Sequence, residues 1–242
     1  MKIYHTITGC LLFLFTTHSV SGQTHKLGAW NIVNYKLNLT RQWGLFAETQ
    51  LRSQLFYDNF SYYEIKGGAS YNFKKNLSTA VGLGRFITYT DGSNFKMPYV
   101  NKESRIWEQL ALNSHIDRVK LENRVRLEQR WTTNLGYRNR LKYRFNTVVP
   151  LNNKKIIPGT FYVSGWDEVY LTNSDPHYEQ NRIYGGVGYE ISPKLTVQSG
   201  FLHQVNYKVD DTHAGKNYIQ LSFLIETSAH SEHHEKGSNS AD

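Results

Sequence analysis

Basic and acidic side chains recur at alternate positions over residues 119–149, and this stretch carries the clearest chemistry in the sequence. Rings of Arg and Lys along a wall attract and select anions, whereas charges buried away from water must find partners. The stretch therefore predicts either an anion-binding wall or a network of internal ion pairs. The bases are Lys120, Arg124, Arg126, Arg130, Arg138, Arg140, Lys142 and Arg144, and the acids are Glu122 and Glu128.

The residues between these charges are apolar or aromatic, which gives the stretch a period of two. This period is typical of a β-strand with one charged face and one apolar face. The first segment, 119–131, is longer than the five or six residues usual for a soluble strand. It suits a tilted strand that crosses a bilayer, which needs roughly 9–11 residues. We therefore expect the charges to face a lumen and the apolar side chains to face lipid, namely Val125, Leu127, Leu141, Tyr143 and Phe145.

The same alternation divides the chain into eleven candidate strands, at 27–39, 43–52, 62–73, 77–89, 105–113, 119–131, 137–149, 161–171, 178–191, 195–207 and 217–227. Three further charges are expected to face the lumen, namely Glu168, Arg182 and Glu190. Single-chain bacterial barrels have even strand numbers. A short strand split off at 23–29 would give twelve, and loss of the first strand would give ten. The predicted fold is an all-β, single antiparallel transmembrane β-barrel of 12 strands, with 10 as the alternative.

The connections between these strands alternate in length. Short turns are expected at 41–42, 74–76, 115–118 and 192–194, and longer loops at 55–60, 90–103, 172–177 and 209–215. Short periplasmic turns and long outer loops are typical of outer-membrane barrels.

Residues 1–22 have the features of a signal peptide, with an apolar run at 11–15 and small residues before Gln23. The single cysteine, Cys10, lies in this segment, so disulfides and thiolate metal sites are not expected in 23–242. No apolar stretch of 18 or more residues follows, which excludes a helical membrane protein. We predict an exported barrel at 23–227 in the cell outer membrane, followed by a disordered His-containing tail at 228–242.

The formal net charge of +8 raises the alternative of nucleic-acid binding. Alternation of the charges with apolar residues along strands of an exported chain favours a polar lumen instead. The expected partners are outer-membrane lipid and anionic small solutes, without nucleic acid, a cofactor or a metal.

Four segments, 126–130, 138–144, 166–170 and 179–189, are together similar to a family of outer-membrane barrels called domain of unknown function 2490, which is frequent in Bacteroidetes. The similarity covers about residues 27–226. It implies a β-barrel in the outer membrane and no established activity.

Three functions remain open at this point. The first is a small pore or binding lumen for anionic solutes. The second is a structural or surface-binding barrel whose lumen is closed by salt bridges, with loop 90–103 as its contact surface. The third, less favoured, is an outer-membrane lipid hydrolase built on His203; Ser199 lies about 13 Å away along the same strand, too far to hydrogen-bond it.

Overall fold

The structure is a computed structural model that describes residues 27–229. The predicted signal peptide, and all but two residues of the predicted tail, lie outside this range. Within it, no helix is long and apolar enough to cross a membrane.

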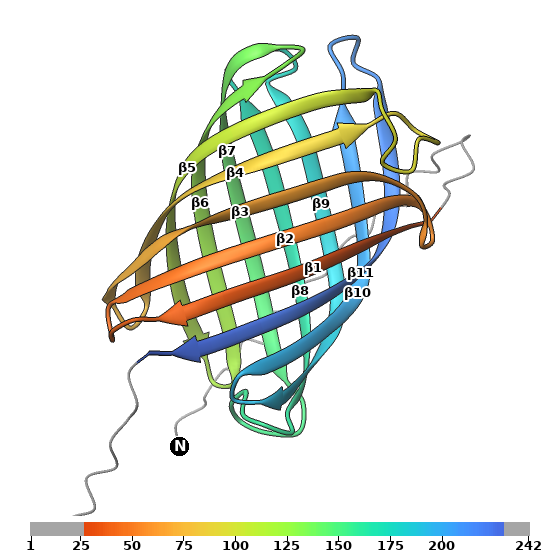
Figure 1. The fold of residues 1–242 in the computed structure, drawn as a ribbon. Helices are drawn as coiled ribbons and strands as arrows, with labels where there is room; N and C mark the ends of the chain where they lie inside the picture. The colour runs from red at the N-terminus through yellow and green to blue at the C-terminus, as the bar shows by residue number, and fades with distance from the viewer. Residues whose placement is uncertain (1–26, 230–242) are drawn as a thin grey trace, which may run out of the picture.

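Eleven strands form one closed barrel, which confirms the predicted all-β barrel class (Figure 1). Each strand pairs with its sequence neighbours, and β1 also pairs with β11. The strands are β1 (Gly28–Asn38), β2 (Trp43–Leu55), β3 (Asp58–Lys74), β4 (Leu77–Tyr89), β5 (Tyr99–Ile116), β6 (Val119–Thr132), β7 (Gly136–Pro150), β8 (Phe161–Thr172), β9 (Tyr178–Ser192), β10 (Leu195–Tyr207) and β11 (His213–Ser228).

The predicted counts of twelve and ten strands are wrong, as is the expectation of a wholly antiparallel sheet. β1 pairs with β11 in parallel, from Gly28 opposite Tyr218 to Asn38 opposite Ser228. Figure 1 shows the two strands side by side and pointing the same way. An even number is required only when every neighbouring pair is antiparallel, so one parallel pair closes a barrel of eleven. In consequence, Gly28 and Ser228 lie at opposite ends of the barrel.

The predicted separation of short turns and long loops holds only in part. The Gly28 end carries the connections 56–57, 90–98, 133–135, 173–177 and 208–212, whereas the Ser228 end carries 39–42, 75–76, 117–118, 151–160 and 193–194. The predicted loop 55–60 is a tight turn, because strand pairing continues to Leu55 opposite Asp58. The longest connection, 151–160, lies among short turns at the Ser228 end. Connection length therefore does not distinguish the two ends.

The connection 90–98 is held against the β2–β3 hairpin. Asn59 donates to the Asp91 carboxylate at 2.5 Å, and the Phe60 N–H donates to Asn94 at 3.2 Å. The Phe95 ring contacts the rings of Phe60, Tyr63 and Tyr89. This segment therefore packs on the outer face of β3 and β4 near the Gly28 end.

Inward glycines make room for aromatic rings on the side of the barrel formed by β8–β11. A Cβ on Gly200 would lie 2.4 Å from the Gly185 carbonyl oxygen, 2.6 Å from the Gly186 Cα and 2.6 Å from the Tyr184 hydroxyl. Two of these atoms belong to the backbone of β9, so they cannot move without displacing that strand. Gly200 is therefore a steric requirement of this wall.

We predict that Gly200→Ala lowers the free energy of unfolding by about 1–3 kcal/mol, because the added methyl group overpacks the interior. Urea unfolding of the purified protein, followed by tryptophan fluorescence, measures the change. Gly185→Ala is the matched control, since a Cβ there meets open space. Equal midpoints for the two variants would contradict the prediction.

Candidate anion-binding cavity

A cavity of about 720 Å³ occupies the barrel interior, and every strand contributes to its lining. The alternation of each strand turns one set of side chains inward, so polar residues from far apart in the sequence meet there. Ten bases and six acids line the cavity. The bases are Arg52, Lys66, Arg105, Arg124, Arg126, Arg130, Arg140, Lys142, Arg144 and Arg182; the acids are Glu48, Glu64, Glu103, Glu128, Glu168 and Glu179.

Most of the residues predicted to face a lumen are part of this lining: Arg124, Arg126, Arg130, Arg140, Lys142, Arg144, Arg182, Glu128 and Glu168. The other four lie outside it. Lys120, Glu122 and Glu190 are on strand segments near the Ser228 end, although Glu122 still pairs with Arg144 at 2.9 Å. Arg138, near the Gly28 end, donates to the Thr172 hydroxyl and the Asp175 carbonyl oxygen.

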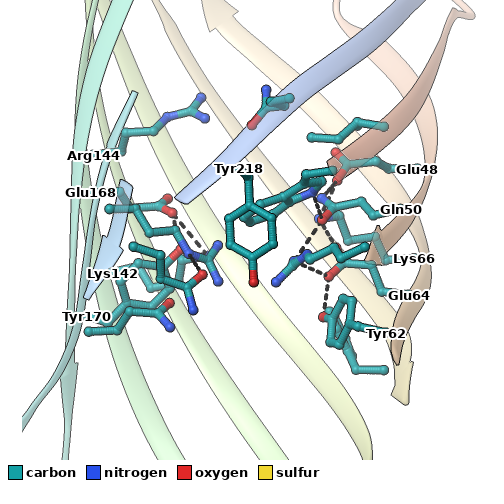
Figure 2. A pocket seen from close by; sticks show the side chains of 18 of the residues that line it. Glu48, Gln50, Tyr62, Glu64, Lys66, Lys142, Arg144, Glu168, Tyr170 and Tyr218 are labelled. Atoms are coloured by element: carbon teal, nitrogen blue, oxygen red, sulfur yellow. Dashed lines mark hydrogen bonds and ion pairs between the residues drawn. The ribbon is translucent and has the colours of Figure 1, made fainter. Parts of the chain in front are cut away.

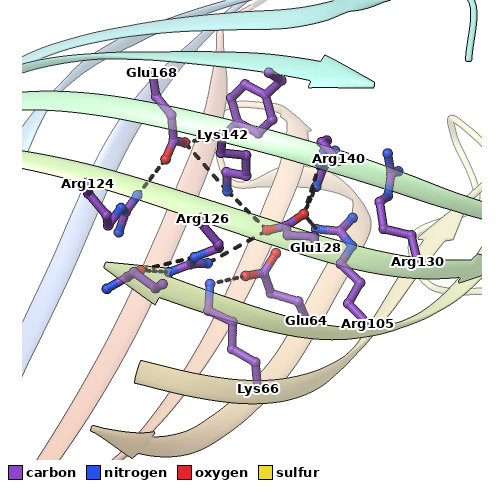
Figure 3. A network of polar contacts seen from close by, with 12 residues as sticks. Glu64, Lys66, Arg105, Arg124, Arg126, Glu128, Arg130, Arg140, Lys142 and Glu168 are labelled. Atoms are coloured by element: carbon purple, nitrogen blue, oxygen red, sulfur yellow. Dashed lines mark hydrogen bonds and ion pairs between the residues drawn. The ribbon is translucent and has the colours of Figure 1, made fainter. Parts of the chain in front are cut away.

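Glu128 is the centre of the largest ion cluster (Figure 3). Its side chain is 2% exposed, and the Arg140 guanidinium on the neighbouring strand donates to it at 2.5 Å. Lys142 lies at 3.5 Å, Arg105 at 3.7 Å and Arg126 at 3.8 Å. One buried carboxylate thus interacts with four cations from three strands, β5, β6 and β7.

Two more carboxylates extend this cluster toward the Gly28 end. Glu103 pairs with Arg105 at 2.7 Å and also accepts from Arg130. Glu179 pairs with Arg130 at 2.8 Å and with Arg140 at 3.0 Å. Because Glu179 lies on β9, these contacts join strands that are not neighbours in the barrel.

A second cluster lies on β2 and β3, across the cavity from Lys142 and Glu168 (Figure 2). Glu64 pairs with Arg52 at 3.1 Å and with Lys66 at 2.7 Å, and Lys66 also pairs with Glu48 at 2.6 Å. With two acids and two bases, this cluster is electrically neutral. The excess positive charge of the cavity therefore belongs to the wall formed by β5–β9.

Sequence reasoning missed several of these residues. The strand patterns already placed the polar face of β2 and β3 opposite their apolar residues, so Glu48, Arg52, Glu64 and Lys66 could have been found. Glu103 lay in a predicted loop, since the start of β5 is more polar than the other strands. Glu179 stands where β9 pairs irregularly with β8, at the register shift between Tyr170 and Leu171.

The charges of the cavity do not balance. Each of the six acids has a base within 4.0 Å. Ten bases against six acids leave four positive charges in excess among the lining residues, and Glu122 balances one of them by pairing with Arg144. Arg182 has no carboxylate within 4.0 Å among residues 27–229 and contacts the Gln204 amide oxygen instead, at 3.0 Å. An interior of this kind can accept anions.

His203, the residue on which the hydrolase alternative rested, lies outside the cavity lining. Its ring Nδ1 is 2.6 Å from the Asn217 amide oxygen. Directly opposite His203 are Ile183 on β9 and Asn217 on β11, and Ser199 faces Val187 and Leu221. The neighbouring strands therefore place no Ser or Thr hydroxyl directly beside His203.

Fold and interior together define a class: a closed eleven-stranded β-barrel with a buried salt-bridge network. The family model described as "Protein of unknown function (DUF2490)" matches residues 27–214, so the chain belongs to this family. Searches of curated proteins and of solved structures give no match.

We predict that Glu128→Gln lowers the free energy of unfolding by about 3–5 kcal/mol, because it leaves buried cations without their shared carboxylate. The measurement is urea unfolding of the purified protein. Asp211→Asn is the control: Asp211 is exposed in the connection 208–212, so we expect a change within about 0.5 kcal/mol. If both variants unfolded at the wild-type urea concentration, the network would not stabilise the fold.

Proposed function

We propose that the protein is an outer-membrane β-barrel whose lumen binds anionic small molecules. The observation that carries this proposal is the charge imbalance of the cavity, in which ten bases meet six acids. Uncompensated charge in a low-dielectric interior is costly, and a bound anion would remove that cost.

The outer surface supports the membrane location. Large apolar side chains are exposed on the outer face of every strand, whereas soluble monomers rarely expose apolar patches larger than a few hundred Å². Lipid would cover such a surface. Examples from around the barrel are Val33, Leu45, Ile65, Leu83, Ile106, Leu127, Leu141, Val163, Val187, Phe201 and Phe223.

Aromatic rings near both ends of the barrel support the same location. Trp43 contacts Tyr71, and Phe161 contacts Tyr189, near the Ser228 end. Near the Gly28 end, the contacting pairs are Tyr63 with Tyr89, Trp131 with Tyr137, and Tyr178 with Tyr207. Two aromatic girdles at the membrane interfaces are typical of outer-membrane barrels.

The contacts between non-neighbouring strands favour a binding pocket over a wide pore. Glu179 on β9 binds Arg130 on β6, and Glu168 on β8 binds Arg124 on β6 at 2.5 Å. Both contacts pass over intervening strands and narrow the lumen. The same contacts support the alternative of a structural barrel closed by salt bridges, which differs from the main proposal in having no ligand.

We predict that the protein fractionates with the outer membrane and migrates faster on a denaturing gel when unheated, because closed membrane barrels resist detergent. The measurement is sucrose-gradient fractionation followed by gel mobility with and without boiling. Recovery in the soluble fraction without a heat-dependent shift would refute the membrane location.

We predict that the detergent-solubilised protein binds citrate and that raising the salt concentration weakens this binding, because salt screens the attraction between charges. Isothermal titration calorimetry measures both effects, with the cation spermidine as the control for charge sign. Absence of both citrate and inorganic phosphate binding at low salt would favour the structural alternative. Planar-bilayer recordings separate a pocket from a pore, since a steady anion-selective current requires an open lumen.

A further inference from the structure

We infer that Lys142 and Arg182 form a subsite for the carboxylates of a small organic di- or trianion, on the two sides of the strand that carries Tyr170. This inference rests on the proposed function and specifies its ligand. The two cations lie on β7 and β9, and both line the cavity.

Lys142 is a buried ammonium group with unused hydrogen-bond donors. Its residue is 8% exposed. The Nζ atom is 3.5 Å from a Glu128 oxygen and 3.8 Å from a Glu168 oxygen, which is long for a charged hydrogen bond. Within residues 27–229, Nζ makes no hydrogen bond. Since an ammonium group carries three donors, a carboxylate in the cavity could accept from it.

Arg182 has unused donors as well. Its Nε donates to the Gln204 amide oxygen at 3.0 Å. Neither terminal nitrogen donates a hydrogen bond to any residue of 27–229. The planar guanidinium fork is suited to bidentate contact with a carboxylate.

Tyr170 holds the two cations in place. The Lys142 Nζ is 4.7 Å from the centre of the Tyr170 ring, and the Arg182 Cζ is 4.8 Å from it. Tyr170 is fully buried, and its hydroxyl donates to Glu168. A fixed ring with cation–π contacts to both side chains reduces the ordering needed when a ligand binds. Figure 2 shows Lys142, Glu168 and Tyr170 on one side of the cavity.

The separation of the two cations indicates the class of ligand. The Lys142 Nζ and the Arg182 Cζ lie 4.7 Å and 4.8 Å from the centre of the same Tyr170 ring, so the two groups are at most about 9.5 Å apart. Two inward cations at that spacing suit carboxylates at the two ends of one small molecule better than a single compact phosphate. Arg182 also lies 4.9 Å from the Trp30 ring, which offers an apolar surface to the carbon skeleton.

The test compares Lys142→Met and Arg182→Gln with two controls that remove the same charge outside the cavity lining, Lys120→Met and Arg138→Gln. The probes are citrate and inorganic phosphate, titrated by calorimetry into the full-length mature protein in detergent. We expect citrate to bind wild type more tightly than phosphate does. Each subsite variant should bind citrate about tenfold more weakly, the typical loss of one charged hydrogen bond, and each control should stay within about twofold of wild type.

Heat-dependent gel mobility verifies that each variant is folded, and Arg182→Lys, which keeps the charge, supplies a second folded variant with an intermediate citrate affinity. Wild-type citrate affinity in both Lys142→Met and Arg182→Gln would overturn the subsite while leaving the anion-binding lumen intact. Phosphate binding as tight as citrate binding would overturn the ligand class. No citrate binding by wild type would overturn the subsite, and no binding of either anion would overturn the proposed function with it.

Discussion

The interior of this barrel depends on the pairing of buried charges. Glu128 and its four cations are almost wholly removed from water, and an ion in that position is tolerated only with close partners of opposite charge. The contacts of β6 and β7 with β9 are of the same kind, because Arg130 on β6 and Arg140 on β7 both pair with Glu179 on β9. Ion pairing therefore determines how the strands of this side are tied across the lumen.

The opposite side of the interior is built differently. Trp30, Tyr184, Leu202 and Tyr218 form an apolar cluster on β1, β9, β10 and β11. Gly186 and Gly200 leave space for the Tyr184 ring, and the Trp30 indole contacts Tyr218 edge to face. This cluster lies beside the parallel β1–β11 pair, so the closing contact of the barrel is supported by ring packing. Arg52 and Arg182 lie against Trp30, where the two kinds of interior meet.

The alternation of polar and apolar residues predicted the class of fold and much of the cavity wall. In a strand, successive side chains point to opposite faces, so the position of a residue indicates whether it faces the lumen. Arg124, Arg126, Glu128 and Lys142 were identified in this way. Alternation does not encode which strand closes the barrel. The wrong strand number came from assuming that β1 and β11 are antiparallel, and nothing in either strand alone indicates a parallel pair.

The sequence also did not predict which acidic and basic side chains form ion pairs across the lumen. That Glu179 joins Arg130 and Arg140 depends on which side chains reach across the lumen, and strand patterns do not contain this information. The length of 90–98 was also misjudged, since the polar residues that open β5, such as Asn101 and Glu103, resemble a loop until their pairing with β4 and β6 is known.

The structural alternative and the binding proposal differ in how the remaining positive charge is neutralised. Five of the six cavity acids already form ion pairs with at least two bases each, and only Glu48 pairs with a single base. Rearranging these ion pairs would move the excess charge without removing it. Glu122 balances one of the excess charges through Arg144, and anions from outside the described residues would balance the others. Lys142 and Arg182 have the unused donors to bind them. A purely structural lumen would need mobile counter-ions at the same positions, and these would be displaced by a better-fitting organic anion.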